Sequence, residues 1–134
     1  MNTVRTFVAL LLLIPQLAGA ASDALLPKQD ILVVVNRHAE LTELTQQQVL
    51  GLFLGRVRNF PNGKAVKAFD NEISSDIRAR FFETLTGKSI SDIDAYWARL
   101  RYSGRASPPK ELKDTGSILD AVRQNREAIA YIPW

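Results

Sequence analysis

The sequence predicts an α/β domain in which a small parallel or mixed sheet is flanked by helices. Two apolar runs, Ile31–Val35 and 128–132, predict strands, and the first, which is uninterrupted and rich in β-branched residues, is typical of a strand that is buried on both faces. Between these runs, helix-start signals and amphipathic stretches surround one more short apolar run at 65–69. Strands separated by helices favour a sheet with helices packed on it.

The first strand, Ile31–Val35, is followed by a helix whose start is marked twice. Thr45 and Gln48 form a capping-box pattern, and Leu44 and Val49 have the spacing of a hydrophobic staple. The helix is expected to stop near Gly55. A turn at 60–63 then leads into the second strand, 65–69.

Two further helices are predicted after the second strand. Ser74 or Ser75 caps the first of these, whose apolar residues recur every four positions until Gly87. Ser89 or Ser91, each followed by an aspartate three positions later, caps the next.

That helix is over by Gly104, and the segment 105–113, with its Pro108-Pro109 pair, is predicted to be a loop. A fourth helix around 118–122 and a third strand at 128–132 complete the order β-α-β-α-α-α-β.

Length and composition indicate one folded domain with no catalytic apparatus. The chain has 134 residues, 46% hydrophobic and 23% charged, which is ordinary for a globular protein. A formal net charge of +3 is too small and too interspersed to predict nucleic-acid binding. There is no cysteine, and His38 is the only histidine. We therefore expect no disulfide, no metal, no cofactor and no enzymatic nucleophile–base pair.

The first twenty residues have the pattern of a secretory signal peptide. Arg5 precedes an apolar run at 7–17, and three small residues follow at 18–20. Pro15 and Gln16 interrupt the run before the roughly 20 apolar residues that a membrane span needs.

Cleavage is expected near Ala20, followed by a flexible lead-in at 21–30 and a single domain at 31–134. The mature domain is then periplasmic or secreted, without stable membrane insertion.

Two loops are candidates for a binding site, because ligands of α/β sheets gather beyond the carboxyl ends of strands, where helix N-termini present free amides. Asn36 follows the first strand, and 70–75 follows the second and runs into a helix. We expect the hydroxyls of Ser74 and Ser75, the neighbouring amides and Arg78 one turn on to hold a small oxyanion, with Asn36 facing the same mouth.

A plainer interpretation stays open, since serine at a helix start is most often an N-cap and Asp76 in the first turn opposes a bound anion. Asp92 and Asp94 have the positions of helix-capping residues. Trp97, with helical spacing to its apolar neighbours, is expected in the core.

Several segments together resemble the phosphate-binding proteins of ABC transporters, which have a type 2 periplasmic binding protein-like fold. The family's motifs are a VVVN strand, an IF-x-G helix end, a W-x-x-G turn, an R-x-x-x-SGT-x-x-x-F ligand loop and an N-P-G-A-I-G-Y strand. Their counterparts here lie at 33–36, 52–55, 60–63, 69–82 and 125–131. The resemblance covers about residues 31–132 and implies a solute-binding protein for phosphate or a similar oxyanion.

The resemblance also implies that this chain corresponds to one lobe of a two-lobed clamp. Ser75 matches the serine of the family's SGT loop, whereas Asp76 and Ile77 stand where the family has glycine and threonine. We therefore expect weak oxyanion binding. The alternative is a single-lobe interaction or regulatory module at the cell envelope that has lost its ligand and contacts a protein partner or a second copy of itself.

Overall fold

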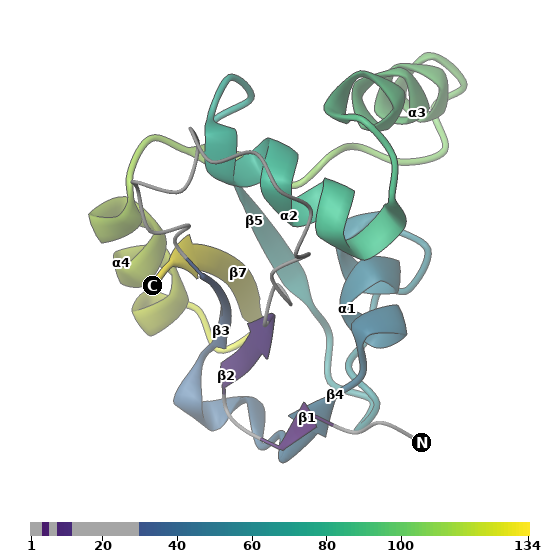
Figure 1. Cartoon of the computed structure of the whole chain (residues 1–134). Helices are drawn as coiled ribbons and strands as arrows, with labels where there is room; N and C mark the ends of the chain where they lie inside the picture. Colours follow the sequence, from purple (N-terminus) through teal and green to yellow (C-terminus); the bar gives the residue numbers. More distant parts are fainter. Residues whose placement is uncertain (1–3, 6–7, 12–29) are drawn as a thin grey trace, which may run out of the picture.

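The computed structural model describes residues 4–5, 8–11 and 30–134. The strands are β1 (Val4–Arg5), β2 (Val8–Leu11), β3 (Ile31–Val35), β4 (Glu43–Leu44), β5 (Lys67–Asn71), β6 (Lys110–Leu112) and β7 (Ala128–Pro133). The helices are α1 (Gln46–Phe53), α2 (Asp76–Thr86), α3 (Ile90–Tyr102) and α4 (Thr115–Gln124), and Arg37–Ala39 form a 3-10 turn, η1. The fold is α/β, as the sequence predicts, with four helices around a small mixed sheet (Figure 1).

The main sheet has the strand order β2-β3-β7-β5-β6. β3 pairs antiparallel with both β2 and β7, and β5 pairs parallel with β7 and β6. The first and second predicted strands therefore run in opposite directions, so their carboxyl ends lie at opposite edges of the sheet.

Each face of the sheet packs against its own helices because neighbouring strand residues point to opposite faces. Ile31 and Val33 join Ile129 and Tyr131 in a core with α1, α2 and α3. The intervening residues of β3 and β7 pack with Phe69 against α4. Figure 1 shows α4 on one side of the sheet and α1 and α2 on the other. This two-sided burial explains why both strands are continuously apolar.

Aromatic rings fill the larger core. Phe81 of α2 stacks on Tyr131 of β7 with ring centroids 3.7 Å apart and an interplanar angle of 4°. Phe53 of α1 meets both rings edge-on. Full burial of such side chains contributes about 1.5–3 kcal/mol each, and it fixes α2 against the sheet.

The helix starts follow the predicted capping chemistry at α1 and α3. Thr45 accepts from the Gln48 amide at 3.1 Å, and the Gln48 side chain accepts from the Thr45 amide at 2.8 Å. Ser89 accepts from the Asp92 amide at 3.3 Å. Asp114 caps α4 in the same way, accepting from the Ser117 amide at 2.7 Å.

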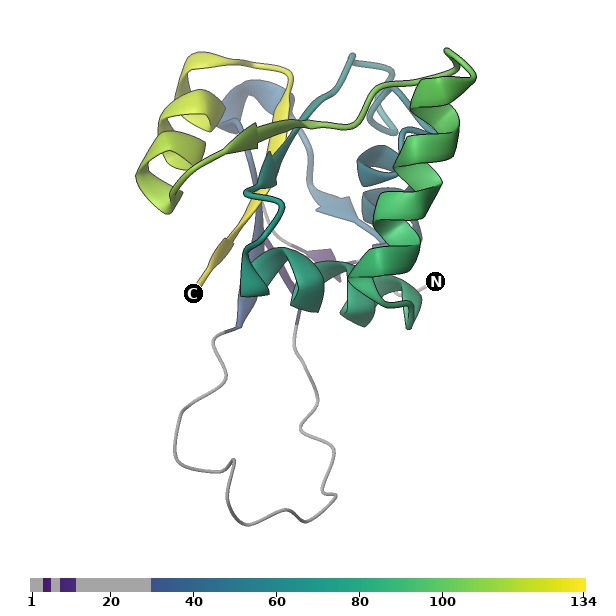
Figure 2. The ribbon, with the colours of Figure 1, turned by 90° about the horizontal axis from the view of Figure 1, so that it is seen from above.

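The second strand and the proline loop differ from expectation. β5 covers Lys67–Asn71, two residues later than the apolar run suggested, because its end is buried through polar residues rather than apolar ones. The predicted loop at 105–113 contains β6, which pairs with β5 at three positions directly after Pro109. Figure 2 shows the chain crossing from α3 to the sheet before it enters this strand.

The structure describes only part of the predicted leader. β1 pairs with β4, and β2 pairs with β3 through Val8–Val34 to Leu11–Ile31. The predicted cleavage point at Ala20 and almost all of the lead-in at 21–30 lie outside the described residues, so both stay predictions. No helix within the described ranges is long and apolar enough to cross a membrane.

Candidate functional site

The structure separates the sequence-predicted binding residues into two places. Ser74, Ser75 and Arg78 lie together where β5 passes into α2. Asn36 follows β3, which runs antiparallel to β7, while β5 runs parallel to β7. The expectation that Asn36 faces the same mouth as the two serines is therefore wrong, because it assumed that the two strands point the same way.

Asn36 instead ties β3 to the end of α4. Its side-chain amide donates to the carbonyls of Val122 at 2.7 Å and Arg123 at 3.1 Å. Its side-chain oxygen accepts from the His38 amide at 2.9 Å and so caps η1. Asn36 is buried, and these contacts occupy its donors and its acceptor.

The N-terminus of α2 keeps its first amides free of internal partners. Ser75 is the N-cap, but both its hydroxyl and its amide donate to the Glu72 carbonyl, at 2.7 Å and 2.9 Å. Among the described residues, no acceptor meets the amides of Asp76, Ile77 or Arg78. By contrast, α1, α3 and α4 each have a side-chain cap. These amides can donate to an acceptor on a bound ligand, and the positive end of the helix dipole favours a negatively charged acceptor.

Arg78 points away from this helix end into a buried ionic network. Its Nε donates to Asp70 Oδ2 at 3.1 Å and its Nη1 to Asp94 Oδ1 at 2.8 Å. The side chains of Arg78 and Asp70 are 4% and 3% exposed, and that of Asp94 is 40% exposed. The guanidinium also lies 5.4 Å from the centre of the Phe82 ring. Asp94 thus pairs with Arg78 and does not act as a helix cap.

Asp70 is the centre of the network. Its Oδ1 accepts from the Tyr131 hydroxyl and from the Asn71 amide, while its Oδ2 faces Arg78. Burial raises the pKa of the Asp70 carboxyl above its ordinary value, although the hydrogen bond from Tyr131 and the charge of Arg78 oppose the rise.

The pKa values of the partners respond to the same burial and charges. Burial raises the pKa of the Tyr131 hydroxyl, and the adjacent Asp70 carboxylate raises it further. Burial alone lowers the pKa of Arg78, but Asp70 and Asp94 outweigh it and the pKa is raised. Arg78 therefore stays charged, and its charge is already neutralised by protein carboxylates.

A cavity of about 450 Å³ opens beside this network. Asp70, Asp94 and Glu111 line it together with Arg78 and Arg101. Asp70 and Tyr131 are not among the predicted site residues, because they are 61 positions apart in the sequence and only the fold brings them together. The available signal in the sequence is an aspartate at the end of an apolar run, because a carboxylate at the end of a buried strand needs a hydrogen-bonding or charged partner.

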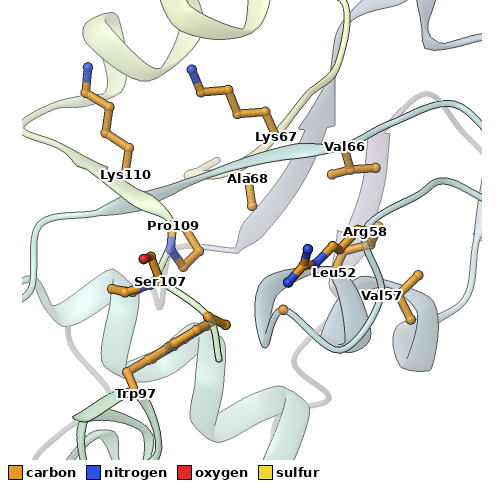
Figure 3. Close-up of a pocket in the computed structure, with 13 residues that line it drawn as sticks. Leu52, Val57, Arg58, Val66, Lys67, Ala68, Trp97, Ser107, Pro109 and Lys110 are labelled. Carbon is orange, nitrogen blue, oxygen red and sulfur yellow. The ribbon is translucent and has the colours of Figure 1, made fainter. Parts of the chain in front are cut away.

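A second cavity, of about 420 Å³, lies between the end of α1, the start of β5, α3 and the segment before β6 (Figure 3). Its floor is apolar, with Leu52, Val66, Ala68 and Trp97. Trp97 and the two prolines border both cavities. Among the described residues, no group of three or more potential metal ligands comes together.

The fold is similar to that of solved transporter substrate-binding proteins. A substrate-binding protein of Clostridium perfringens, assigned to phosphate ABC transport and crystallised with bound phosphate, aligns with a TM-score of 0.60 and 18% identity over 78% of this chain and 39% of that chain. An ABC-type phosphate transport receptor from Vibrio cholerae aligns with a TM-score of 0.56 and 21% identity, over 77% of this chain and 40% of the receptor.

This chain thus spans about two-fifths of the length of those proteins and matches a single lobe of a periplasmic binding protein-like fold. At these identities the likeness is one of fold. The sequence matches no family model and no curated protein.

Proposed function

We propose that this protein is an exported, non-enzymatic solute-binding lobe that holds a small oxyanion such as phosphate weakly at the N-terminus of α2. The observation that carries the proposal is the set of uncapped amides at Asp76 and Ile77. A helix N-terminus of this kind suits an anion because its amides point outward and its dipole end is positive. The fold shared with solved substrate-binding proteins supports the same assignment.

The side chains around the helix end make the binding weak. Ser74 is exposed and can donate its hydroxyl, and the Ser75 hydroxyl can leave the Glu72 carbonyl to do the same. Asp76 places a negative charge in the first turn, which repels an anion. Arg78 adds only a distant and largely neutralised charge, because Asp70 and Asp94 hold its guanidinium.

The test compares thermal melting of the protein in millimolar phosphate and in chloride at matched ionic strength. Ligand that binds only the native state stabilises it by RT ln(1 + [L]/Kd), which is about 2.7 kcal/mol at a concentration of 100 Kd. We expect a phosphate-specific rise in Tm for the wild type and a smaller one for Ser75→Ala.

Ser75→Asp is the decisive variant. An aspartate at the N-cap accepts from the same amides that the anion uses, so the helix is capped from within. We expect Ser75→Asp to raise the Tm in chloride and to abolish the phosphate response, while the exposed Ser91→Ala behaves as the wild type does. A phosphate response that survives in Ser75→Asp would place the anion elsewhere.

The second candidate function is an interaction module at the cell envelope. It is favoured by Ile73, which is 56% exposed at the rim of the cavity beside Arg78, and by the neutralised charge of that arginine. This function predicts no phosphate response and, for self-association, a mass in light scattering that rises with protein concentration. Ile73→Ser should then return the protein to a monomer.

A further inference from the structure

The cavity between α1, α3 and the start of β5 has a charge pattern that differs from that of its neighbour. Every charged residue that lines it is a cation: Arg58, Lys67 and Lys110. The neighbouring cavity carries three carboxylates. A cavity bordered by one sign of charge attracts ligands of the opposite sign.

Of these cations, Arg58 reaches the cavity itself. Figure 3 shows its guanidinium pointing into the space that Ser107, Pro109 and Trp97 border from the other side, whereas Lys67 and Lys110 extend away from that space. Lys67 lies 5.4 Å from the Phe69 ring, on the face of the sheet that packs against α4. Within the described residues, no carboxylate pairs with Arg58. Arg58 is therefore the group that meets an anion inside the cavity.

Trp97 is a buried residue of the cavity wall. Its side chain is 3% exposed, and its indole Nε1 is buried without a hydrogen-bond partner among the described residues. Because Nε1 is shielded from solvent, a molecule in the cavity meets the carbon atoms of the indole ring and not this donor. The indole is held firmly, since its far ring edge packs against Gly55 at the end of α1.

The remaining walls are apolar. Leu52, Val66 and Ala68 close the floor, and Pro108 and Pro109 form part of the rim. A ligand that fits must therefore bury a hydrocarbon body and present one negatively charged acceptor to a guanidinium. Such a ligand is unlike a fully hydrated inorganic oxyanion, which has no apolar part to bury.

We propose that this cavity is a second binding site, specific for small organic carboxylates with an apolar body. The Arg58 guanidinium pairs with the carboxylate, and the hydrocarbon part lies on Leu52, Val66, Ala68 and the Trp97 ring. This site is separate from the N-terminus of α2 and stands without the oxyanion proposal.

The test follows the two indole N–H signals of the ¹⁵N-labelled protein by NMR during titration with phenylacetate. Trp134→Phe identifies the Trp97 signal, and Trp134 is 76% exposed, so its replacement leaves the core intact. Phenylacetamide has the same shape without the charge, and inorganic phosphate has the charge without the apolar body. Because Trp97 lines the cavity, we expect a saturable shift of its signal with phenylacetate and at least about tenfold weaker binding of the other two.

Arg58→Gln and Arg123→Gln are a matched pair of variants. Each removes one positive charge from an exposed arginine, but Arg123 lies on α4 and lines a different cavity. We expect Arg58→Gln to weaken phenylacetate binding about tenfold and Arg123→Gln to change it less than twofold. The proposal is overturned by the absence of a saturable shift at tens of millimolar phenylacetate, by equal responses to phenylacetamide or phosphate, or by unchanged affinity in Arg58→Gln.

Discussion

Arg78 and Asp70 form a buried ion pair at the base of the candidate site, with Nε and Oδ2 3.1 Å apart and both side chains almost fully hidden from solvent. The sequence predicts that Arg78 helps to hold an oxyanion, but the structure pairs its guanidinium with carboxylates of the protein itself. The pair links the end of β5 to α2 and, through Tyr131, to β7. Substitution of Arg78 is therefore expected to change the stability of the fold more than the binding of a ligand.

Arg78→Met should destabilise the protein by about 3–5 kcal/mol, because it leaves the Asp70 carboxylate buried without a cation. Asp94 contributes little to this loss, since its side chain is 40% exposed. Urea denaturation measures the free energy of unfolding. Arg101→Met, an exposed arginine on α3, is the control and should stay within about 0.5 kcal/mol of the wild type. Equal effects of the two substitutions would contradict the role of the pair.

Stability should depend on pH through Asp70. Its pKa in the folded protein lies above the ordinary value of 3.8, chiefly because of burial. Between these two pKa values the folded protein keeps a proton that the unfolded chain has released, so the free energy of unfolding falls as the pH rises through that window. Above the raised pKa this contribution is constant.

Asp70→Asn removes that slope, and urea denaturation at a series of pH values measures it. The exposed carboxyls of Glu40 and Asp114 have lowered pKa values, through Lys64 and through the Ser117 amide, and they give the opposite slope. Both are present in the wild type and in the variant, so the difference between the two profiles isolates Asp70. Parallel profiles would show that Asp70 does not titrate in this range.

Asn36 should prove structural. Asn36→Ala leaves the buried carbonyl of Val122 and the partly buried carbonyl of Arg123 without their shared donor and should cost about 1–3 kcal/mol. Asn36→Asp keeps the shape but turns a carboxylate toward the same carbonyls at the negative end of α4, so it should cost more than alanine does. Denaturation at low pH, where the new carboxyl is protonated, should narrow the gap between the two variants. An aspartate variant as stable as the wild type would contradict this role.

Local signals in the sequence predicted much of the fold correctly. The Thr45 and Gln48 capping box and the Ser89 cap each depend on residues three positions apart, so they can be read without tertiary context. The same holds for β3 and β7, whose residues are buried on both faces. β6 was not predicted because its three residues, Lys110–Leu112, have no apolar pattern and form a strand only beside β5.

The site was harder to predict because its geometry depends on strand direction and on distant partners. A run such as Ile31–Val35 has the same pattern in a parallel and in an antiparallel strand, and that direction decides where Asn36 lies. Arg78 and Asp94 are 16 positions apart, and Tyr131 and Asp70 are 61 apart. Only the folded chain shows that these residues form hydrogen bonds and ion pairs with one another.

Gly55 should be required at the end of α1 for two separable reasons. Its φ of +69° is one that residues with a side chain rarely adopt, and a Cβ there would lie 3.0 Å from the Trp97 ring. Gly87, at the end of α2, also has a φ of +69° but has open space around it. Gly87→Ala should therefore cost about 1–2 kcal/mol through backbone strain alone.

Gly55→Ala should cost a further 1–3 kcal/mol or so, because the ring edge must move out of a packed core. Urea denaturation of both variants measures the difference, and the Trp97 fluorescence in a Trp134→Phe background reports whether the ring moves. Equal losses in the two glycine variants, with unchanged Trp97 emission, would show that the contact between Gly55 and Trp97 carries no energy. A larger loss at Gly55 would mean that the end of α1 sets the position of the indole, and with it the wall of the cavity that Arg58 borders.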